Sequence, residues 1–326
     1  MKNRMRSVLR VVAGALLALP TIQATAQNYP DRAVRIIVPA PAGSPGDIIA
    51  RALAQKFTEG MGQSFVIDNR AGANYGIGTE AVAKSAADGY TLLLTASPHT
   101  INPHLYPNQA FDPIRDFAPI TLVAVTPLVL VVHPSVPANS VGELLALARS
   151  QPGKLNFGSA GNGSTLHLAG EIFNTLGAVK MVHVPYKGVT QAVTDLVGGQ
   201  LSLMFPGGPI ALPQVKAGKL RALATTGAVR TAAAPDLPTV AEAGLPGFEI
   251  SAWYGMLAPA GTPSAVITRL HREVLKLLQT PELKERWLAL GADIVYQNTP
   301  ELYGAFLRND LAKWAKVIKD ANVRVE

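Results

Sequence analysis

The sequence has no cysteine among its 326 residues. Disulfide bonds and lipid attachment through cysteine are therefore excluded. Charged residues are also few, at 16%, and the lysines and arginines behind the formal charge of +7 are scattered rather than gathered in runs with interleaved aromatic residues. This scatter excludes nucleic acid as a partner. Beyond the N-terminus, no apolar run reaches the roughly 20 residues that a membrane span requires.

The N-terminus has the three parts of a secretory signal peptide. Four Lys and Arg residues precede a short apolar run, Val11–Leu19, and Ala24-Thr25-Ala26 forms a small-x-small cleavage motif. We expect residues 1–26 to be removed by cleavage after Ala26, which lowers the formal charge from +7 to +3. No twin-arginine pair is present, so ordinary secretion into the periplasm is expected.

The most informative stretch is residues 34–57, VRIIVPAPAGSPGDIIARALAQKF. A β-branched strand is followed by a turn rich in Pro and Gly, and then by apolar residues at helical spacing, with Asp47 where a cap belongs. A loop of Gly and Ser that opens into a helix offers unpaired N–H groups and the positive end of the helix dipole to an anion. The stretch therefore predicts a place that holds a carboxylate.

The second half of the chain repeats this arrangement. A strand at 155–158 runs into a second Gly/Ser loop, SAGNGS at 159–164, which opens into another helix. In both halves short strands alternate with helices, which predicts sheets covered by helices. We expect an α/β fold with two lobes joined by two crossover strands around a small ligand. The predicted lobe 1 comprises residues 27–125 and 252–326, and the predicted lobe 2 comprises residues 126–251.

Several collinear segments of the chain resemble one family. They are PDRAVRIIVPAPAGSPGDIIAR (30–51), DNRAGANYGIGTEAVAKSAADGYTLLL (68–94), FGSAGNGSTLHLAGEIF (157–173), VHVPYKG (182–188), AGKLRALA (217–224) and LPTVAEAGLPG (237–247). They resemble the Bug, or TctC-like, receptors, which are periplasmic binding proteins of tripartite tricarboxylate transporters. The resemblance implies a type II periplasmic-binding-protein fold without enzymatic activity. It also implies a monomeric receptor that binds a small carboxylate and delivers it to integral-membrane transporter subunits.

The resemblance further implies which residues bind the ligand. In the family, the loop after the first strand and the Gly/Ser loop of the second lobe hold the carboxylate, partly through ordered water. Residues after the third strand and near the crossings would line the same cleft. His99 could instead stabilise its own loop, and Trp253 could instead pack at the hinge. The expected ligand-binding residues are Ala40, Ala42, Gly43, Ser44, Asp47, Ser97, His99, Ser159, Asn162, Gly163, Ser164, Thr165, Pro206 and Trp253.

The sequence departs from the family pattern at positions that affect ligand choice. The family often has an aromatic residue where Ala40 stands, and Gly-Ser-Thr or Gly-Gly-Thr at positions 44–46. It often has Asp followed by Asn where Pro206 and Gly207 stand. A cleft Asp is what a ligand amine would pair with, and the loss of an aromatic residue leaves room. These departures predict a bulky carboxylate ligand without an amine, including aromatic acids.

Two other functions fit parts of the sequence. The same receptor could hand its ligand signal to a membrane kinase instead of a transporter. Alternatively, Ala42-x-Ser44-x-Gly46 resembles the nucleophile elbow of a secreted esterase, with Ser44 as the nucleophile. No Asp and His in the expected order accompany Ser44, so the esterase is the weaker hypothesis. The six His residues show no close metal-ligand spacing, and we expect neither a metal nor a cofactor.

Overall fold

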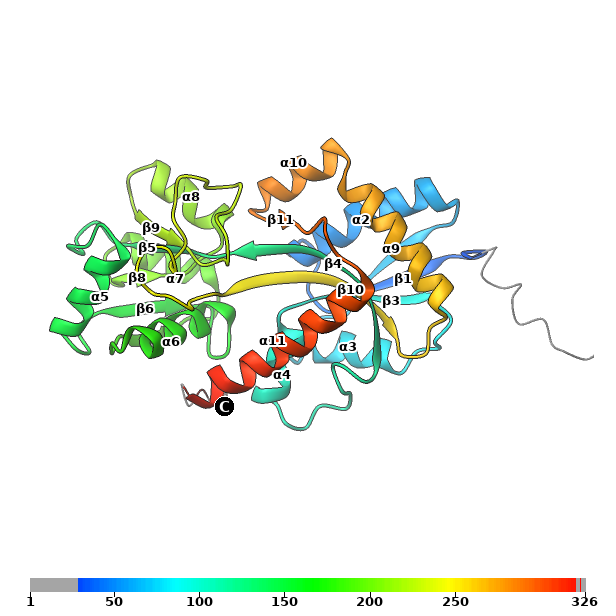
Figure 1. The fold of residues 1–326 in the computed structure, drawn as a ribbon, viewed down its shortest axis with the longest axis horizontal. Helices are drawn as coiled ribbons and strands as arrows, with labels where there is room; N and C mark the ends of the chain where they lie inside the picture. The colour runs from blue at the N-terminus through cyan, green and yellow to red at the C-terminus, as the bar shows by residue number, and fades with distance from the viewer. Residues whose placement is uncertain (1–28, 321–322, 324–326) are drawn as a thin grey trace, which may run out of the picture.

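The computed structural model describes residues 29–320 and 323, which form two sheets with helices packed on them (Figure 1). The predicted signal peptide lies outside these residues. The larger sheet has the strand order β11-β4-β10-β3-β1-β2. In this sheet β1 pairs in parallel with β2 and β3, and the other pairings are antiparallel. Its strands are β1 (Val34–Val38), β2 (Phe65–Asn69), β3 (Thr91–Ala96), β4 (Phe117–Pro127), β10 (Ser251–Pro259) and β11 (Asp293–Ile294).

The smaller sheet has the strand order β7-β6-β8-β5-β9. Here β6 pairs in parallel with β7 and β8, whereas β5 runs antiparallel to β8 and β9. Its strands are β5 (Val129–Val132), β6 (Asn156–Ser159), β7 (Val182–Pro185), β8 (Leu203–Met204) and β9 (Arg221–Thr225). We refer to the larger sheet with its helices as the first lobe, and to the smaller sheet with its helices as the second lobe.

The helices alternate with the parallel strands, as expected for α/β units. The first lobe contains α2 (Pro45–Met61), α3 (Gly76–Ala83), α4 (Pro98–Leu105), α9 (Ser264–Leu278) and α10 (Pro281–Ala289). The second lobe contains α5 (Val141–Ser150), α6 (Thr165–Gly177), α7 (Val189–Val197) and α8 (Gly208–Lys216). In the described part of the chain, no helix combines the length and the apolar character that crossing a membrane demands.

Two segments of chain connect the lobes side by side (Figure 1). One passes from β4 through Leu128 into β5, and the other returns through Ile250 into β10. The buried hydroxyl of Thr226 bridges them, because Oγ1 accepts the Leu128 N–H at 2.7 Å and donates to the Ile250 carbonyl at 2.6 Å. This side chain thus adds a bridge between the two crossings at the hinge, beside the backbone hydrogen bonds of Thr226 to Leu128 and Ile250 and the pairing of β4 with β10.

The last helix, α11 (Pro300–Asp320), packs on both lobes. Its first half buries Tyr303 and Leu307 with Trp253 in a cluster of the first lobe. Its second half places Trp314 and Ile318 in the core of the second lobe. Figure 1 shows the helix running along the connecting strands from one lobe toward the other. The C-terminal segment therefore contributes to both cores, a feature that its place in the predicted lobe 1 does not convey.

Close packing of helix on sheet depends on small residues at particular points. A Cβ at Gly170 of α6 would lie 2.1 Å from Cε2 of Phe157 on β6. Phe157 is fully buried, so the ring has no room to move. The glycine therefore sets the distance between α6 and its sheet, and α6 carries one of the two loops of interest.

Two local expectations differ from the structure. The helix α2 is capped by Ser44 rather than Asp47: Ser44 Oγ accepts the Asp47 N–H at 3.3 Å, and the helix begins at Pro45. His99 lies on the helix α4, residues 98–105, rather than on a loop, because Pro98 occupies a first-turn position where its missing N–H costs nothing.

Candidate ligand-binding site

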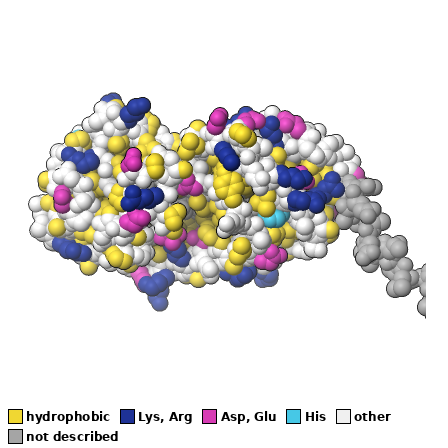
Figure 2. Space-filling view, turned by 45° about the horizontal axis from the view of Figure 1, so that its top comes forward, with side chains coloured by type: hydrophobic (Ala, Val, Ile, Leu, Met, Phe, Trp, Pro, Cys, Tyr) yellow, Lys and Arg dark blue, Asp and Glu magenta, His cyan; other side chains and the backbone are white. Residues whose placement is uncertain are grey.

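The ends of the parallel strands of the two lobes face each other across the connecting strands. In the first lobe β1 ends at Val38 and leads into α2, and in the second lobe β6 ends at Ser159 and leads into α6. Figure 1 shows the start of each of these helices on the side of its lobe that faces the other lobe. Figure 2 shows one face of the molecule, with β11 and α10 turned toward the viewer, and on this face the surface is hollowed between the lobes, with hydrophobic and acidic side chains along the hollow. The two Gly/Ser loops thus border one interlobe space.

The first loop is held in shape by the buried carboxylate of Asp47. Oδ2 accepts the Gly43 N–H at 2.8 Å and Arg51 Nε at 2.9 Å, and Oδ1 accepts Asn69 Nδ2 at 3.0 Å. Burial alone would raise the pKa of Asp47, but the hydrogen bonds from Arg51, Gly43 and Asn69 together lower it. Asp47 is therefore a structural anchor of the loop, and the N–H of Gly43 is already occupied.

Other donors of the first loop have no partner in the described chain. The N–H of Gly46, in the first turn of α2, has no acceptor. A Cβ at Gly46 would lie 3.6 Å from Cε1 of Tyr254, so this ring covers the start of the helix. Burial raises the pKa of Tyr254, with a further contribution from the nearby Tyr75, and burial raises the pKa of Tyr75 to about 12. Both phenols stay protonated and are candidate donors.

Tyr75 and Tyr254 were not predicted as site residues. Tyr75 lies on the Gly-rich turn before α3 in a left-handed conformation, with φ of +77°, and α3 begins at the next residue, Gly76. Tyr254 follows Trp253 on β10, so the two side chains point to opposite faces of the sheet, and the Tyr254 ring lies beside the start of α2. The sequence does not indicate which residues of β10 face the two loops, because nearly all residues of this strand are apolar.

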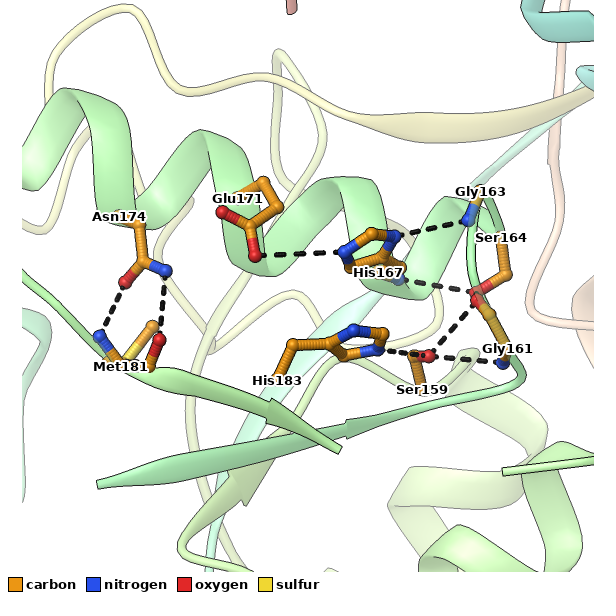
Figure 3. A network of polar contacts seen from close by, with 9 residues as sticks. All are labelled: Ser159, Gly161, Gly163, Ser164, His167, Glu171, Asn174, Met181 and His183. Atoms are coloured by element: carbon orange, nitrogen blue, oxygen red, sulfur yellow. Dashed lines mark hydrogen bonds and ion pairs between the residues drawn. The ribbon is translucent and has the colours of Figure 1, made fainter. Parts of the chain in front are cut away.

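The second loop is held by a network of hydroxyls, backbone groups and two imidazoles (Figure 3). Ser164 Oγ donates to the Gly161 carbonyl at 2.7 Å and accepts the His167 N–H at 3.3 Å, which makes Ser164 the cap of α6. Ser159 Oγ accepts the Gly161 N–H at 3.0 Å and lies 2.7 Å from Nε2 of His183. Both serine hydroxyls are therefore committed to the loop itself.

Several groups of the second loop have no partner within the described chain. They are the backbone N–H of Thr165, the Thr165 hydroxyl and the side-chain amide of Asn162. Asn162 is exposed and Thr165 is partly exposed. These groups lie at the N-terminus of α6, where N–H groups and the helix dipole favour an anion. They can donate hydrogen bonds to a carboxylate.

The expected site residues divide into a surface group and a buried group. Those at least partly exposed are Ala42, Gly43, Ser44, Asn162, Ser164 and Thr165. Those buried are Ala40, Asp47, Ser97, His99, Ser159, Gly163, Pro206 and Trp253. The side chains of the buried group lie inside the protein, and several of them hold the loops in place.

The residues after the third strand that were expected to line the cleft are buried, and their side chains contact the protein. Ser97 Oγ accepts the Trp253 N–H at 3.0 Å and is buried. His99 lies 2.8 Å from the carbonyl of Pro113 through Nε2, and burial lowers its pKa to about 4. Trp253 donates from Nε1 to Asp310 at 2.9 Å, so its ring packs at the hinge.

Ala40 and Pro206 also contribute to the core. Ala40 is 2% exposed, and its carbonyl accepts Asn69 Nδ2 at 3.1 Å. The Pro206 carbonyl accepts the Val129 N–H at 2.8 Å, and the residue is buried. The small side chain of Ala40 therefore does not enlarge the interlobe space, because it points into the first lobe.

A second hollow lies on the other side of the connecting strands. Its volume is about 650 Å³, and its walls include Trp253, Phe306 and Lys313. It is bordered by β11 and by the loop after β9. β11 is the edge strand next to β4, and β9 is the edge strand next to β5. It is therefore separate from the two Gly/Ser loops. Within residues 29–320 and 323, no group of His, Asp and Glu is arranged to hold a metal ion.

Ser44 lacks the partners that a catalytic nucleophile needs. Its Oγ has one hydrogen-bond partner in the described chain, the backbone N–H of Asp47. A serine nucleophile requires an imidazole or another base within hydrogen-bond reach. The elbow-like spacing at 42–46 thus marks a helix cap, and the second lobe repeats the same cap at Ser164.

Comparisons with known proteins give the family and the fold of the relatives of this chain. Residues 49–323 match the sequence model of the family described as "Tripartite tricarboxylate transporter family receptor". Protein BugT of Bordetella pertussis is 37% identical over 322 residues, which cover 98% of each chain. The solved structure of R. palustris Rpa4515 with adipate is 36% identical with a TM-score of 0.77, covering 91% of this chain and 99% of that one. MatC from Rhodopseudomonas palustris with bound malate is 31% identical with a TM-score of 0.72, covering 89% and 100%.

Proposed function

The chain belongs to the tripartite tricarboxylate transporter receptor family, and we propose that it captures an organic carboxylate without an amine between its two lobes. In this proposal the receptor is exported and works in the periplasm. Once it has bound its ligand there, it delivers the ligand to membrane-embedded transporter subunits. The family consists of periplasmic solute-binding receptors and not of enzymes.

One observation carries the choice of ligand class. Two helices that begin on facing sides of the interlobe space each carry a backbone N–H without an acceptor, on Gly46, which is buried beside Tyr254, and on Thr165, which is partly exposed. Helix N-termini favour anions, and hydrogen bonds to a charged acceptor contribute about 1.5–3 kcal/mol each. The Thr165 hydroxyl and the protonated Tyr75 and Tyr254 phenols add neutral donors. Donors from both lobes support capture of an anion by lobe closure.

The absence of a free acidic side chain in the first loop supports a ligand without an amine. Asp47 is the carboxylate of that loop, and three donors of the protein already occupy its oxygens. A protonated amine would need an unoccupied carboxylate or equivalent acceptors. The relatives with adipate and with malate have diacids as their ligands, which makes diacids the first class to test. The expected bulk of the ligand gains no support from Ala40, because this side chain points into the first lobe and adds no space between the lobes.

The test is isothermal titration calorimetry with adipate, malate, benzoate and aspartate. We expect an amine-free acid to bind more tightly than aspartate. Thr165→Val removes one hydroxyl and keeps the shape of the side chain, and should weaken binding about 10-fold because a bond to a charged group is lost. Thr175→Val, an exposed position near the other end of α6, is the matched control and should bind as the unchanged protein does.

Two outcomes would contradict the proposal. Binding of aspartate more tightly than of every amine-free acid would refute the ligand class. Equal binding by Thr165→Val and Thr175→Val would show that the Thr165 hydroxyl does not contact the ligand.

A further inference from the structure

Four consecutive residues before α3 have backbone conformations that side chains disfavour. The φ angles of Gly72, Ala73, Asn74 and Tyr75 are +131°, +46°, +44° and +77°. Glycine adopts a positive φ freely and Asn tolerates it, but Ala and above all the bulky Tyr meet a steric cost there. Strained backbone of this kind persists only where the surrounding structure holds it, and it is concentrated at ligand sites. The contacts of the turn 72–75 therefore show what holds it and which side chain it places.

Asn102 of α4 holds this turn. Its Nδ2 donates to the backbone carbonyl of Asn74, and its Oδ1 accepts Asn74 Nδ2 at 2.7 Å. Because a carbonyl can only accept, the two bonds together fix which way the Asn102 amide faces. Asn102 is buried, and its helix is joined to α11 by the Thr100 hydroxyl, which donates to Asp310 at 2.6 Å. Asn102 therefore ties the peptide bond between Asn74 and Tyr75 to a fixed part of the first lobe.

The turn lies against the start of the first Gly/Ser loop. The Arg70 N–H donates to the Val38 carbonyl at 2.9 Å, and a Cβ at Gly78 would lie 2.7 Å from Cβ of Pro39. Both ends of the segment 70–78 thus contact the residues that lead from β1 into the loop. The turn is therefore held beside one of the two loops that border the interlobe space.

The Tyr75 ring packs in the first lobe beside Tyr254. Both rings contact the cluster that contains Ala40 and Ile49, and the Tyr254 ring lies beside Gly46. Packing accounts for the ring of Tyr75 but not for its hydroxyl, which has no hydrogen-bond partner within the described chain. Burial raises the pKa of Tyr75 to about 12, so this hydroxyl stays protonated. A desolvated hydroxyl without a partner costs free energy, and a ligand oxygen would remove that cost.

We propose that Asn102 is a positioning residue of the ligand site: through Asn74 it keeps Tyr75 in its left-handed conformation, so that the Tyr75 hydroxyl donates to a carboxylate oxygen of the bound acid. The inference deepens the proposed function and rests on it. Asn102 itself contacts no ligand. Loss of the hydroxyl, or of its position, should weaken adipate binding about 10-fold, because one hydrogen bond to a charged acceptor is lost.

The first arm of the test needs no ligand and follows Tyr75 by carbon-13 at Cζ of tyrosine. The signal that Tyr75→Phe lacks belongs to Tyr75. At about pH 10.5 this signal should keep the position of a neutral phenol in the unchanged protein, since the pKa is about 12. In Asn102→Ala the turn is released, and the signal should move toward that of an ionised phenol, whose ordinary pKa is about 10. Asn298→Ala, which removes another buried amide of the first lobe, is the control and should leave the signal in place.

The second arm measures adipate affinity by calorimetry at pH 7. We expect a loss of about 10-fold in Tyr75→Phe, a similar loss in Asn102→Ala and no further loss in the double variant, because Asn102 acts through Tyr75. Asn298→Ala and Tyr296→Phe, which removes an exposed hydroxyl beside the second hollow, should bind as the unchanged protein does. If Asn102→Ala does not fold, Asn102→Asp takes its place, since it keeps the size of the side chain and loses the donor to Asn74.

Three results would overturn the inference. They are an unchanged adipate affinity in Tyr75→Phe, additive losses in the double variant, and a Tyr75 signal that stays neutral in Asn102→Ala. Any of these together with tight adipate binding by the unchanged protein would leave the proposed function standing. If adipate, malate and benzoate all fail to bind the unchanged protein, the proposed ligand class is refuted, and a Tyr75 signal that still responds to Asn102→Ala reduces Asn102 to a purely structural role.

Discussion

The anchoring role of Asp47 gives the sharpest stability prediction. Asp47→Asn keeps the size of the side chain but replaces one carboxylate oxygen by an NH₂ group, which then faces the donors from Gly43 and Arg51 or the donor from Asn69. A charge-assisted bond contributes about 1.5–3 kcal/mol, but the Arg51 head is 55% exposed and can return to water. We therefore expect a loss of about 2 kcal/mol in the free energy of unfolding at pH 7.

The assay is urea unfolding followed by the fluorescence of the three buried tryptophans. Asp320→Asn is the control, because Asp320 is an exposed helix residue whose partner within the described residues is Lys316, and such a change stays within about 0.5 kcal/mol. Equal stability of Asp47→Asn and the unchanged protein at pH 7 would refute the anchoring role.

The pH dependence provides an independent check of the same reasoning. The folded-state pKa of Asp47 is lowered, so its stabilisation is complete above the unfolded-chain value of about 3.9 and is lost as the pH falls through the folded-state value. The gap between Asp47→Asn and the unchanged protein should therefore narrow below about pH 3.9. A gap that stays constant on acidification would mean that the carboxylate charge is not the cause.

Three further predictions concern the hinge, the packing of α6 and acid stability. Thr226→Val leaves the buried Leu128 N–H and Ile250 carbonyl without the Thr226 hydroxyl, and should lower the free energy of unfolding in urea by about 2–4 kcal/mol. Thr194→Val, on an exposed helix face, is the control and should lower it little. Equal losses in the two variants would contradict the bridging role of Thr226. Gly170→Ala should strongly destabilise the protein, because the added Cβ would meet Phe157. Gly60→Ala is the control: this position of α2 has open space around it, and the variant should stabilise the protein by about 0.5–1 kcal/mol. Unchanged stability of Gly170→Ala would disprove the close contact. Because the pKa of His99 is lowered to about 4, stability should fall by up to about 3 kcal/mol as the pH drops from 6.5 toward 4; an unchanged slope in His99→Gln would contradict this.

The sequence predicted the two-lobe α/β class and the two Gly/Ser loops because both depend on local patterns. A β-branched run, a turn with Gly and Pro and a helical apolar stripe follow one another within 24 residues at 34–57. The comparisons confirm the receptor family and its two-lobe fold. The ligand-binding role of individual residues stays a prediction.

The direction of loop side chains could not be predicted, since periodicity does not apply outside helices and strands. Ala40 points into the core, and Asp47 turns back onto its own loop. The stacking of His167 on His183 depends on how α6 lies against β7, a tertiary arrangement without a local signal. The same holds for Tyr254, whose ring reaches the start of α2 from a strand about 200 positions later.

The most direct test of the central claim is a crystal structure of the protein grown with adipate. The account predicts a carboxylate between the lobes, with its oxygens about 2.7–3.2 Å from the N–H groups of Gly46 and Thr165. An adipate bound elsewhere, such as in the hollow beside Trp253 and Lys313 behind the hinge, would contradict it.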